Sequence, residues 1–163
     1  MELFIYLFAA LFSVLNPIGT VPIFVALTEG YTSAERAKVS LITSINVLII
    51  LLISFFIGQY VLSFFGITIT ALRIAGGIII TSSGFGLLNG NFSKSKGINK
   101  KVQKEVQNRT HIALTPLAMP MLAGPGSISL LIAYYQEHNT TSEIIISTIS
   151  ITVVAVTIYL VLR

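Results

Sequence analysis

The sequence predicts an all-α, polytopic helical membrane protein made of inverted three-helix repeats, with two broken helices and the sixth helix absent from this chain. Three observations predict this fold class: long apolar runs, a proline–glycine motif that occurs twice, and an odd number of runs in each repeat. Hydrophobic residues make up 54% of the chain and charged residues only 10%, whereas soluble domains carry about 25% charged residues. The mean hydropathy is +0.89. A transmembrane barrel would instead show short alternating segments, which the sequence lacks.

The first apolar run extends from about residue 3 to 27, long enough to cross a bilayer, which takes about 20 apolar residues. A seven-residue motif, Asn16 to Pro22, lies inside it. Proline lacks a backbone N–H and clashes with the carbonyl four residues earlier, so two prolines around a glycine are expected to break the helix. Broken backbone at membrane depth persists only where it faces protein or a polar cavity. The candidate substrate-binding residues here are Asn16, Pro17, Gly19, Thr20 and Pro22.

Two more spans complete a first repeat, residues 1–88. Thr32 and Glu35 resemble a capping box that opens the second span, which runs from about residue 39 into the low sixties. The third span, about 71–88, is rich in glycine, alanine and serine, a composition typical of a helix packed tightly in a bundle. Arg73 in its first turn is expected to pair with a helix C-terminus, with Glu2 or with Glu137.

Residues 89–111 form one basic, cytoplasmic loop with six Lys or Arg and a single Glu. A juxtamembrane cluster of this kind is attracted to anionic lipid, so membrane lipid rather than nucleic acid is the expected partner. The fourth span, about 112–135, and the fifth, about 143–162, form a second, incomplete repeat, residues 112–163. The whole chain, 1–163, is therefore expected to be a single transmembrane domain.

The second proline–glycine motif lies in the fourth span and runs from Pro120 to Gly126. Its prolines, Pro120 and Pro125, have the spacing of the first pair, and a displacement of 103 residues superimposes the two pairs. Three spans per repeat is an odd number, so the second repeat must be inverted in the membrane. Inverted repeats with broken helices are typical of secondary transporters that bind substrate at the midplane. The candidate substrate-binding residues here are Pro120, Gly124, Pro125, Gly126 and Ser127.

The same displacement predicts a sixth span beyond residue 163, so the chain is expected to be a fragment. At each break, the half-helix that follows offers free N–H groups and a positive dipole end, which suit a carboxylate. The preceding half-helix offers carbonyls for an ammonium group or a cation, and Thr20 and Ser127 add hydroxyls. The alternative is that the prolines only kink the helices and neighbouring hydroxyls repair the gaps. Two related breaks favour the binding site.

The distribution of basic residues predicts the orientation. Nine Lys or Arg fall on the side that holds the loops after the first and third spans and the C-terminal end, and only Arg73 falls near the other side. Positive residues favour the cytoplasm, so the N-terminus is expected outside.

The chemistry of an enzyme is not evident. No P-loop, buried Ser-His-Asp set or metal-ligand cluster is visible, the chain has no cysteine, and His111 and His138 are far apart in the predicted topology. All six acids fall at span ends or in loops, so a coupled cation would be held by carbonyls, hydroxyls or the substrate's carboxylate. We expect no enzymatic activity, no cofactor and no metal site.

Three segments, LNPIGTVPIF, ALRIAGG and PLAMPMLAGPGSIS, together resemble the MarC-like integral membrane protein family, which includes a group of small neutral amino acid transporters. The resemblance implies a six-helix, multi-pass protein of the plasma membrane, the inner membrane in bacteria. It implies transport of a small neutral amino acid such as glycine or alanine by alternating access, with a coupling cation as a further partner. A non-transporting scaffold or regulatory protein, and an exporter of small metabolites or drugs, stay open as alternatives. No oligomeric state is predicted.

Overall fold

The computed structural model describes residues 2–88, 117–118 and 122–163, and these residues are helical apart from short connections. Pro120 and the predicted loop 89–111 lie outside them. The helices are α1 (Glu2–Leu15), α2 (Pro17–Leu27), α3 (Ser33–Phe64), α4 (Ile69–Leu88), α8 (Pro125–Glu137) and α9 (Thr141–Leu162).

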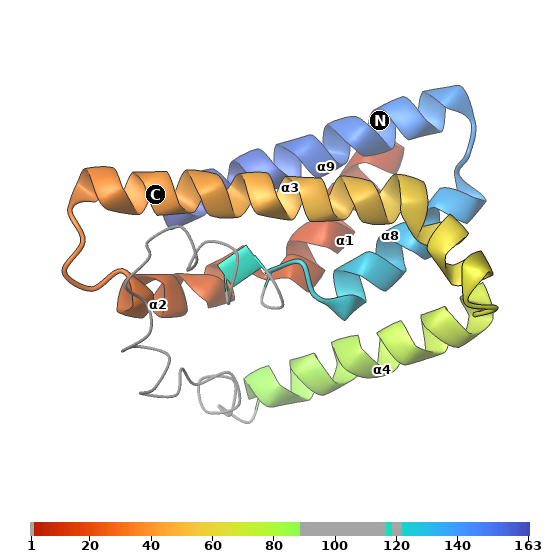
Figure 1. The fold of residues 1–163 in the computed structure, drawn as a ribbon, viewed down its shortest axis with the longest axis horizontal. Coiled ribbons are helices and arrows are strands. Elements are labelled where there is room, and N and C mark those ends of the chain that lie inside the picture. Colours follow the sequence, from red (N-terminus) through yellow and green to blue (C-terminus); the bar gives the residue numbers. More distant parts are fainter. Residues whose placement is uncertain (1, 89–116, 119–121) are drawn as a thin grey trace.

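The two longest helices, α3 and α9, lie side by side and run in opposite directions (Figure 1). The Ser40 hydroxyl on α3 donates a hydrogen bond to the Tyr159 carbonyl on α9 at 3.0 Å. α1 packs against α9, and α8 packs against α3. The centre is apolar, with fully buried side chains such as Leu11 of α1, Leu51 of α3 and Ile158 of α9.

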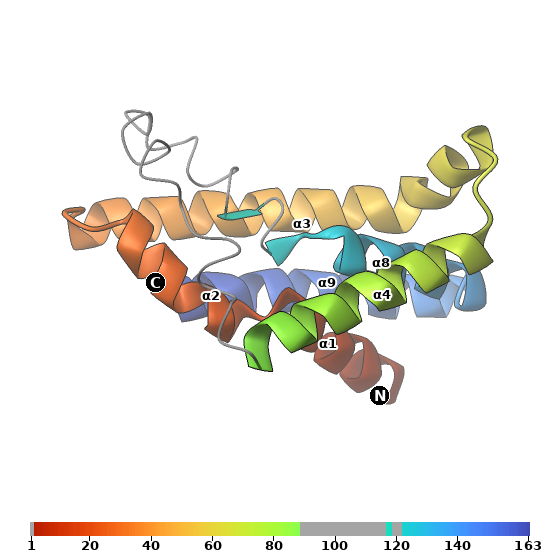
Figure 2. The same ribbon diagram turned by 90° about the horizontal axis from the view of Figure 1, so that it is seen from below.

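α4 lies at the edge of the bundle, in front of the other helices when the molecule is seen from below (Figure 2), and its main partner is α8. The contact is close, because a methyl group on Gly76 would overlap the side chain of Ser129. At the far end of α8, Arg73 forms an ion pair with Glu137. Glu137 was one of three partners expected for Arg73, and the structure selects it.

The ends of the helices follow from local sequence signals. Thr32 and Glu35 form the expected capping box, in which each side chain accepts a hydrogen bond from the other residue's backbone N–H. Thr140 and Glu143 form a second box at the start of α9. α3 ends at Phe64, and Gly66 two residues later has a φ of 66°, the left-handed conformation that favours glycine after a helix.

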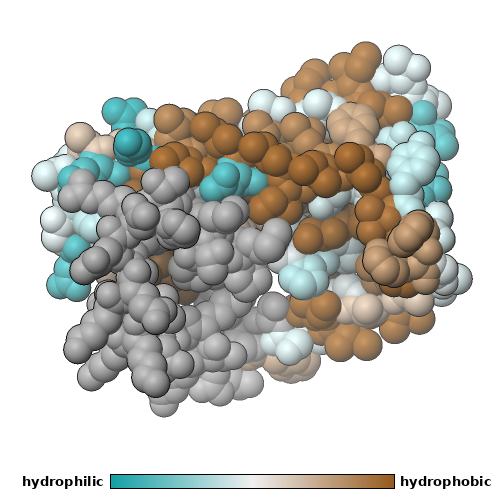
Figure 3. Space-filling model, in the orientation of Figure 1, coloured by the Kyte–Doolittle hydropathy of each residue, from teal (hydrophilic) through white to brown (hydrophobic). Residues whose placement is uncertain are grey.

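On the face shown in Figure 3, an apolar band runs along the bundle between more hydrophilic ends, as expected for a lipid-facing surface. Among the described residues, three segments are long and apolar enough to cross a membrane: Glu2–Leu27, Ser33–Phe64 and Thr141–Leu162. Many of their large apolar side chains point outward, for example Ile53 and Leu160. Together with the shorter apolar helix Ile69–Ser82, these segments make the chain a polytopic helical membrane protein.

Candidate functional site

The first break is narrower than the sequence predicts. It is confined to Asn16, which has a left-handed φ of 45° between α1 and α2. α2 then begins at Pro17 and continues through Pro22, so the expectation that Pro22 helps to break the helix is wrong. Proline suits the first position of a helix, where no N–H is needed. Pro22 removes only one helical hydrogen bond, a loss that membrane helices tolerate.

Asn16 closes much of the N-terminal end of α2. Its side-chain oxygen accepts a hydrogen bond from the Gly19 N–H at 3.1 Å, and its carbonyl accepts one from the Thr20 hydroxyl at 3.2 Å. Pro17 has no N–H, so Ile18 provides the one remaining uncapped donor of the first turn. The first break therefore has fewer free N–H groups for binding an anion than the sequence predicts.

The carbonyls at the end of α1 are more open. The helical partner of Ser13 O would be the N–H of Pro17, which does not exist, and the partner of Leu15 O would be Gly19 N–H, which donates to Asn16 instead. The C-terminal end of α1 is therefore a concentration of negative partial charge, which favours a cation or an ammonium group.

The second break has the opposite character. α8 begins at Pro125 after Gly124, whose extended backbone provides no side-chain cap. The N–H groups of Gly126 and Ser127 occupy the first turn of α8, where no helical acceptor is available. Both residues are buried, and the N-cap residue Gly124 has no side chain to accept from these donors. The Ser127 hydroxyl donates to Gly124 O at 2.9 Å, so it stabilises the turn and does not cap an N–H group.

The two breaks lie next to each other in the middle of the molecule. A Cβ atom on Gly126 would be 3.5 Å from Val14 Cγ1 at the end of α1 and 2.8 Å from Ile80 Cγ1 on α4. From this point α2 and α8 run apart toward opposite ends of the bundle (Figure 1). The negative end of α1 thus lies beside the positive end of α8.

The structure also changes the register of the repeat. Pro17 and Pro125, the first residues of α2 and α8, are 108 residues apart, and so are the two capping threonines, Thr32 and Thr140. The displacement of 103 residues, taken from the proline spacing, is therefore wrong for the helix starts. In the first motif the helix begins at the first proline, whereas in the second it begins at the second proline.

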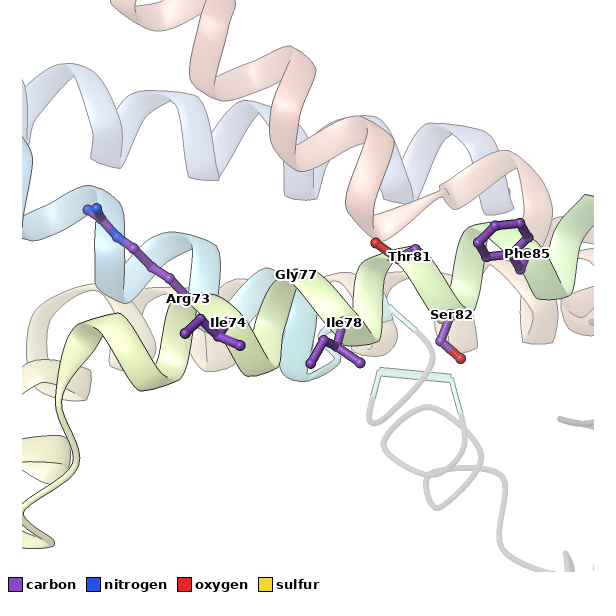
Figure 4. Close-up of a pocket in the computed structure, with 7 residues that line it drawn as sticks. All are labelled: Arg73, Ile74, Gly77, Ile78, Thr81, Ser82 and Phe85. Atoms are coloured by element: carbon purple, nitrogen blue, oxygen red, sulfur yellow. The ribbon is translucent and has the colours of Figure 1, made fainter.

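A hollow of about 610 Å³ lies along the outward face of α4, and all of its lining residues in the described part of the chain belong to α4 (Figure 4). Ile74, Ile78 and Ser82 point away from the bundle, whereas Thr81 points toward the side on which α1 ends. Ile80, next to Thr81, contacts Gly126. α4 is not among the elements that the sequence predicts for the site, and the signal for it was the glycine-rich composition of this helix.

The candidate residues therefore fall into three groups. The structure brings Asn16, Pro17, Gly19 and Thr20 together around the first break and Gly124, Pro125, Gly126 and Ser127 around the second. Pro22 is exposed on α2, away from the break, and Pro120 lies outside the described residues. Within the described part of the chain, no group of His, Cys, Asp and Glu is arranged to hold a metal ion.

The chain is similar to several membrane proteins. It is 40% identical over 162 residues to a UPF0056 membrane protein of Buchnera aphidicola, which covers 99% of this chain and 74% of the relative. It is 41% identical over 124 residues to the UPF0056 inner membrane protein MarC of Escherichia coli, covering 72% of this chain and 55% of the relative. An archaeal UPF0056 relative from Methanocaldococcus jannaschii is 42% identical over 129 residues, 79% of this chain and 62% of its own length.

No solved structure matches the chain significantly. The family model for MarC family integral membrane proteins matches residues 1–163 in full. The chain therefore belongs to the MarC family of integral membrane proteins.

Proposed function

We propose that this protein is a secondary transporter of a small neutral solute, most directly glycine or alanine, that works by alternating access across the plasma membrane. The observation that carries the proposal is the contact between the two breaks, where Val14 at the end of α1 lies beside Gly126 at the start of α8. Broken helices that meet near the middle of a bundle are the usual substrate site of such transporters.

The charges of the two helix ends suit a zwitterion. An amino acid's carboxylate would accept hydrogen bonds from the Gly126 and Ser127 N–H groups at the positive end of α8. Its ammonium group would donate to the Ser13 and Leu15 carbonyls at the negative end of α1. Oppositely charged helix ends side by side would bind both groups without a buried ionised side chain, which is costly at membrane depth.

The surroundings of Gly126 favour a small substrate. Ile80 and Val14 already approach Gly126 closely enough that an added methyl group there would contact both side chains. A substrate bound at this N-terminus would therefore have Ile80 and Val14 as neighbours, and two bulky side chains nearby favour glycine and alanine over larger amino acids.

The alternative is a scaffold or regulatory protein whose breaks only shape the helix packing. The hydroxyls of Thr20 and Ser127 satisfy backbone carbonyls, as that alternative requires. The N–H groups of buried Gly126 and Ser127, which Gly124 cannot cap with a side chain, favour a ligand, because buried backbone donors normally have partners.

The test is uptake of labelled alanine into proteoliposomes containing the full-length protein, with and without Na⁺ and proton gradients. We expect substrate-dependent flux that Gly126→Val abolishes, whereas Gly77→Val, on a glycine with nothing within 4 Å of an added Cβ, retains it. Flux only from preloaded vesicles would identify an exporter. No flux in either direction from a folded sample, with no thermal stabilisation by alanine, would favour the scaffold.

A further inference from the structure

A groove of about 130 Å³ lies between α3 and α9, on the outer surface of the bundle. Both helices line it. The residues are Leu41, Ser44, Ile45 and Leu48 from α3 and Thr152, Ala155, Val156 and Tyr159 from α9. Leu41, Ile45 and Val156 are about half exposed, at 47%, 45% and 53%. The groove is therefore apolar and opens toward the lipid.

Basic side chains gather at one end of this groove. Lys38 precedes Leu41 by three residues and Ile45 by seven, so it continues the same face of α3. Arg163 follows Tyr159 by one turn, and its guanidinium carbon lies 5.9 Å from the centre of the Tyr159 ring. Because Ser40 contacts Tyr159 and the helices are antiparallel, Arg36 and Arg163 lie level with each other.

Arg36 among these cations has a side-chain donor without a partner in the described part of the chain. The ion pair of Arg73 with Glu137 lies at the other end of α3. Glu35, the acid next to Arg36, accepts a hydrogen bond from the Thr32 N–H and caps the helix. Arg36 Nε is buried and has no hydrogen-bond partner in the described part of the chain. A buried, unpartnered donor of this kind is unusual and points to a missing acceptor.

We propose that this groove binds one anionic phospholipid, with its phosphate held by Lys38, Arg163 and Arg36 and an acyl chain lying between α3 and α9. The 32-residue α3 exceeds the roughly 20 residues that span the hydrocarbon core, so its first turns extend to the depth of the headgroups. The apolar lining of the groove begins one turn further into the membrane. The order of the charges and the apolar surface therefore matches the order of headgroup and tail in a phospholipid.

A second copy of this chain fits the groove less well. Around a two-fold axis along the membrane normal, the same ends of both copies would meet, and the cations of one copy would face those of the other. An anionic lipid neutralises these cations, whereas a symmetric protein contact brings like charges together.

In Figure 3, hydrophilic residues gather where α3 begins and an apolar band follows along the helix.

The test compares phosphatidylglycerol with phosphatidylcholine of the same acyl chains, added to the purified full-length protein in detergent. Binding is measured by native mass spectrometry and by the shift in unfolding temperature. We expect the wild type to prefer phosphatidylglycerol. Lys38→Gln combined with Arg163→Gln should weaken phosphatidylglycerol binding by about tenfold, since each cation near an anionic headgroup contributes a factor of several. Arg73→Gln, at the opposite end of the bundle, should leave the preference unchanged.

A second pair of variants tests the acyl chain. Val156→Phe fills the groove and should reduce binding of both lipids, whereas Val153→Phe, on the exposed surface of the same helix, should not. Equal binding of the two lipids by the wild type would overturn the proposal, as would a double variant that keeps the full preference. Stabilisation by inorganic phosphate equal to that by phosphatidylglycerol, with no effect of Val156→Phe, would show an anion site without a lipid tail and would also overturn it.

Discussion

At the scale of single residues, Asn16 determines the geometry of the first break in two ways. It adopts a left-handed backbone, which asparagine tolerates better than most residues, and its side chain caps Gly19 N–H. Asn16→Ala should lose the cap and retain the backbone strain, and we expect a loss of about 2 kcal/mol in the free energy of unfolding. Asn16→Gly relieves the strain and should lose only a few tenths of a kcal/mol. Thermal and denaturant unfolding in detergent would check this order, and an alanine variant as stable as the glycine variant would contradict it.

The ion pair between Arg73 and Glu137, which joins α4 to α8, is a second interaction between single residues. Both side chains are about half exposed, at 47% and 57%, so water screens their attraction. A double-mutant cycle with Arg73→Gln and Glu137→Gln should give a coupling energy below about 1 kcal/mol. Unfolding measured at low and high salt would check the sign, because salt should reduce the coupling. A coupling of several kcal/mol would mean that the pair is buried from water.

At the scale of helices, the contact of α4 with α8 depends on one of two adjacent glycines. A Cβ on Gly76 would overlap Ser129, whose Cβ is fixed to the backbone, so α4 would have to move away from α8. Gly77 has nothing within 4 Å of an added Cβ. Gly76→Ala should therefore destabilise the protein, whereas Gly77→Ala should be neutral or stabilise it by up to about 1 kcal/mol through helix propensity. Unfolding of the two variants side by side would decide, and equal effects would contradict the close packing.

The first residues of the helices show which sequence signals predict a helix start correctly. Thr32 with Glu35 predicted the start of α3 correctly, because a capping box is a local signal that does not depend on packing. Thr140 and Glu143 carry the same signal, and it would have fixed the start of α9. The proline spacing was a poorer guide, since proline can begin a helix, as at Pro17 and Pro125, or lie within one, as Pro22 does.

The contact between the two breaks could not be predicted from the sequence. It depends on which side chains meet in three dimensions, namely Val14 and Ile80 at Gly126. The capping of Gly19 by Asn16 likewise depends on a left-handed backbone that asparagine adopts only in some settings. Composition and motif spacing identified the two breaks, and helix packing determines that they lie together with opposite polarity.

At the scale of the whole molecule, the described helices alternate in direction in the way that inverted repeats require. α2 and α8 leave the centre toward opposite ends, and α3 and α9 are antiparallel (Figure 1). Arg36, Lys38 and Arg163 lie at one end of the bundle, while Arg73 lies at the other (Figure 1). This asymmetry predicts that the end with three cations faces the cytoplasm and that the N-terminus lies outside.

The absence of cysteine from the chain allows a direct test of this orientation, because each introduced cysteine is the only one present. Gly30 has a φ of 80°, so Gly30→Cys would be strained, and Glu29→Cys is the better position in the turn between α2 and α3. Asn139→Cys serves the turn between α8 and α9, at the opposite end of the bundle. In intact cells a membrane-impermeant maleimide should label Asn139→Cys at once and Glu29→Cys only after permeabilisation. The reverse pattern would place the N-terminus inside, and labelling of both sites in intact cells would contradict a single orientation.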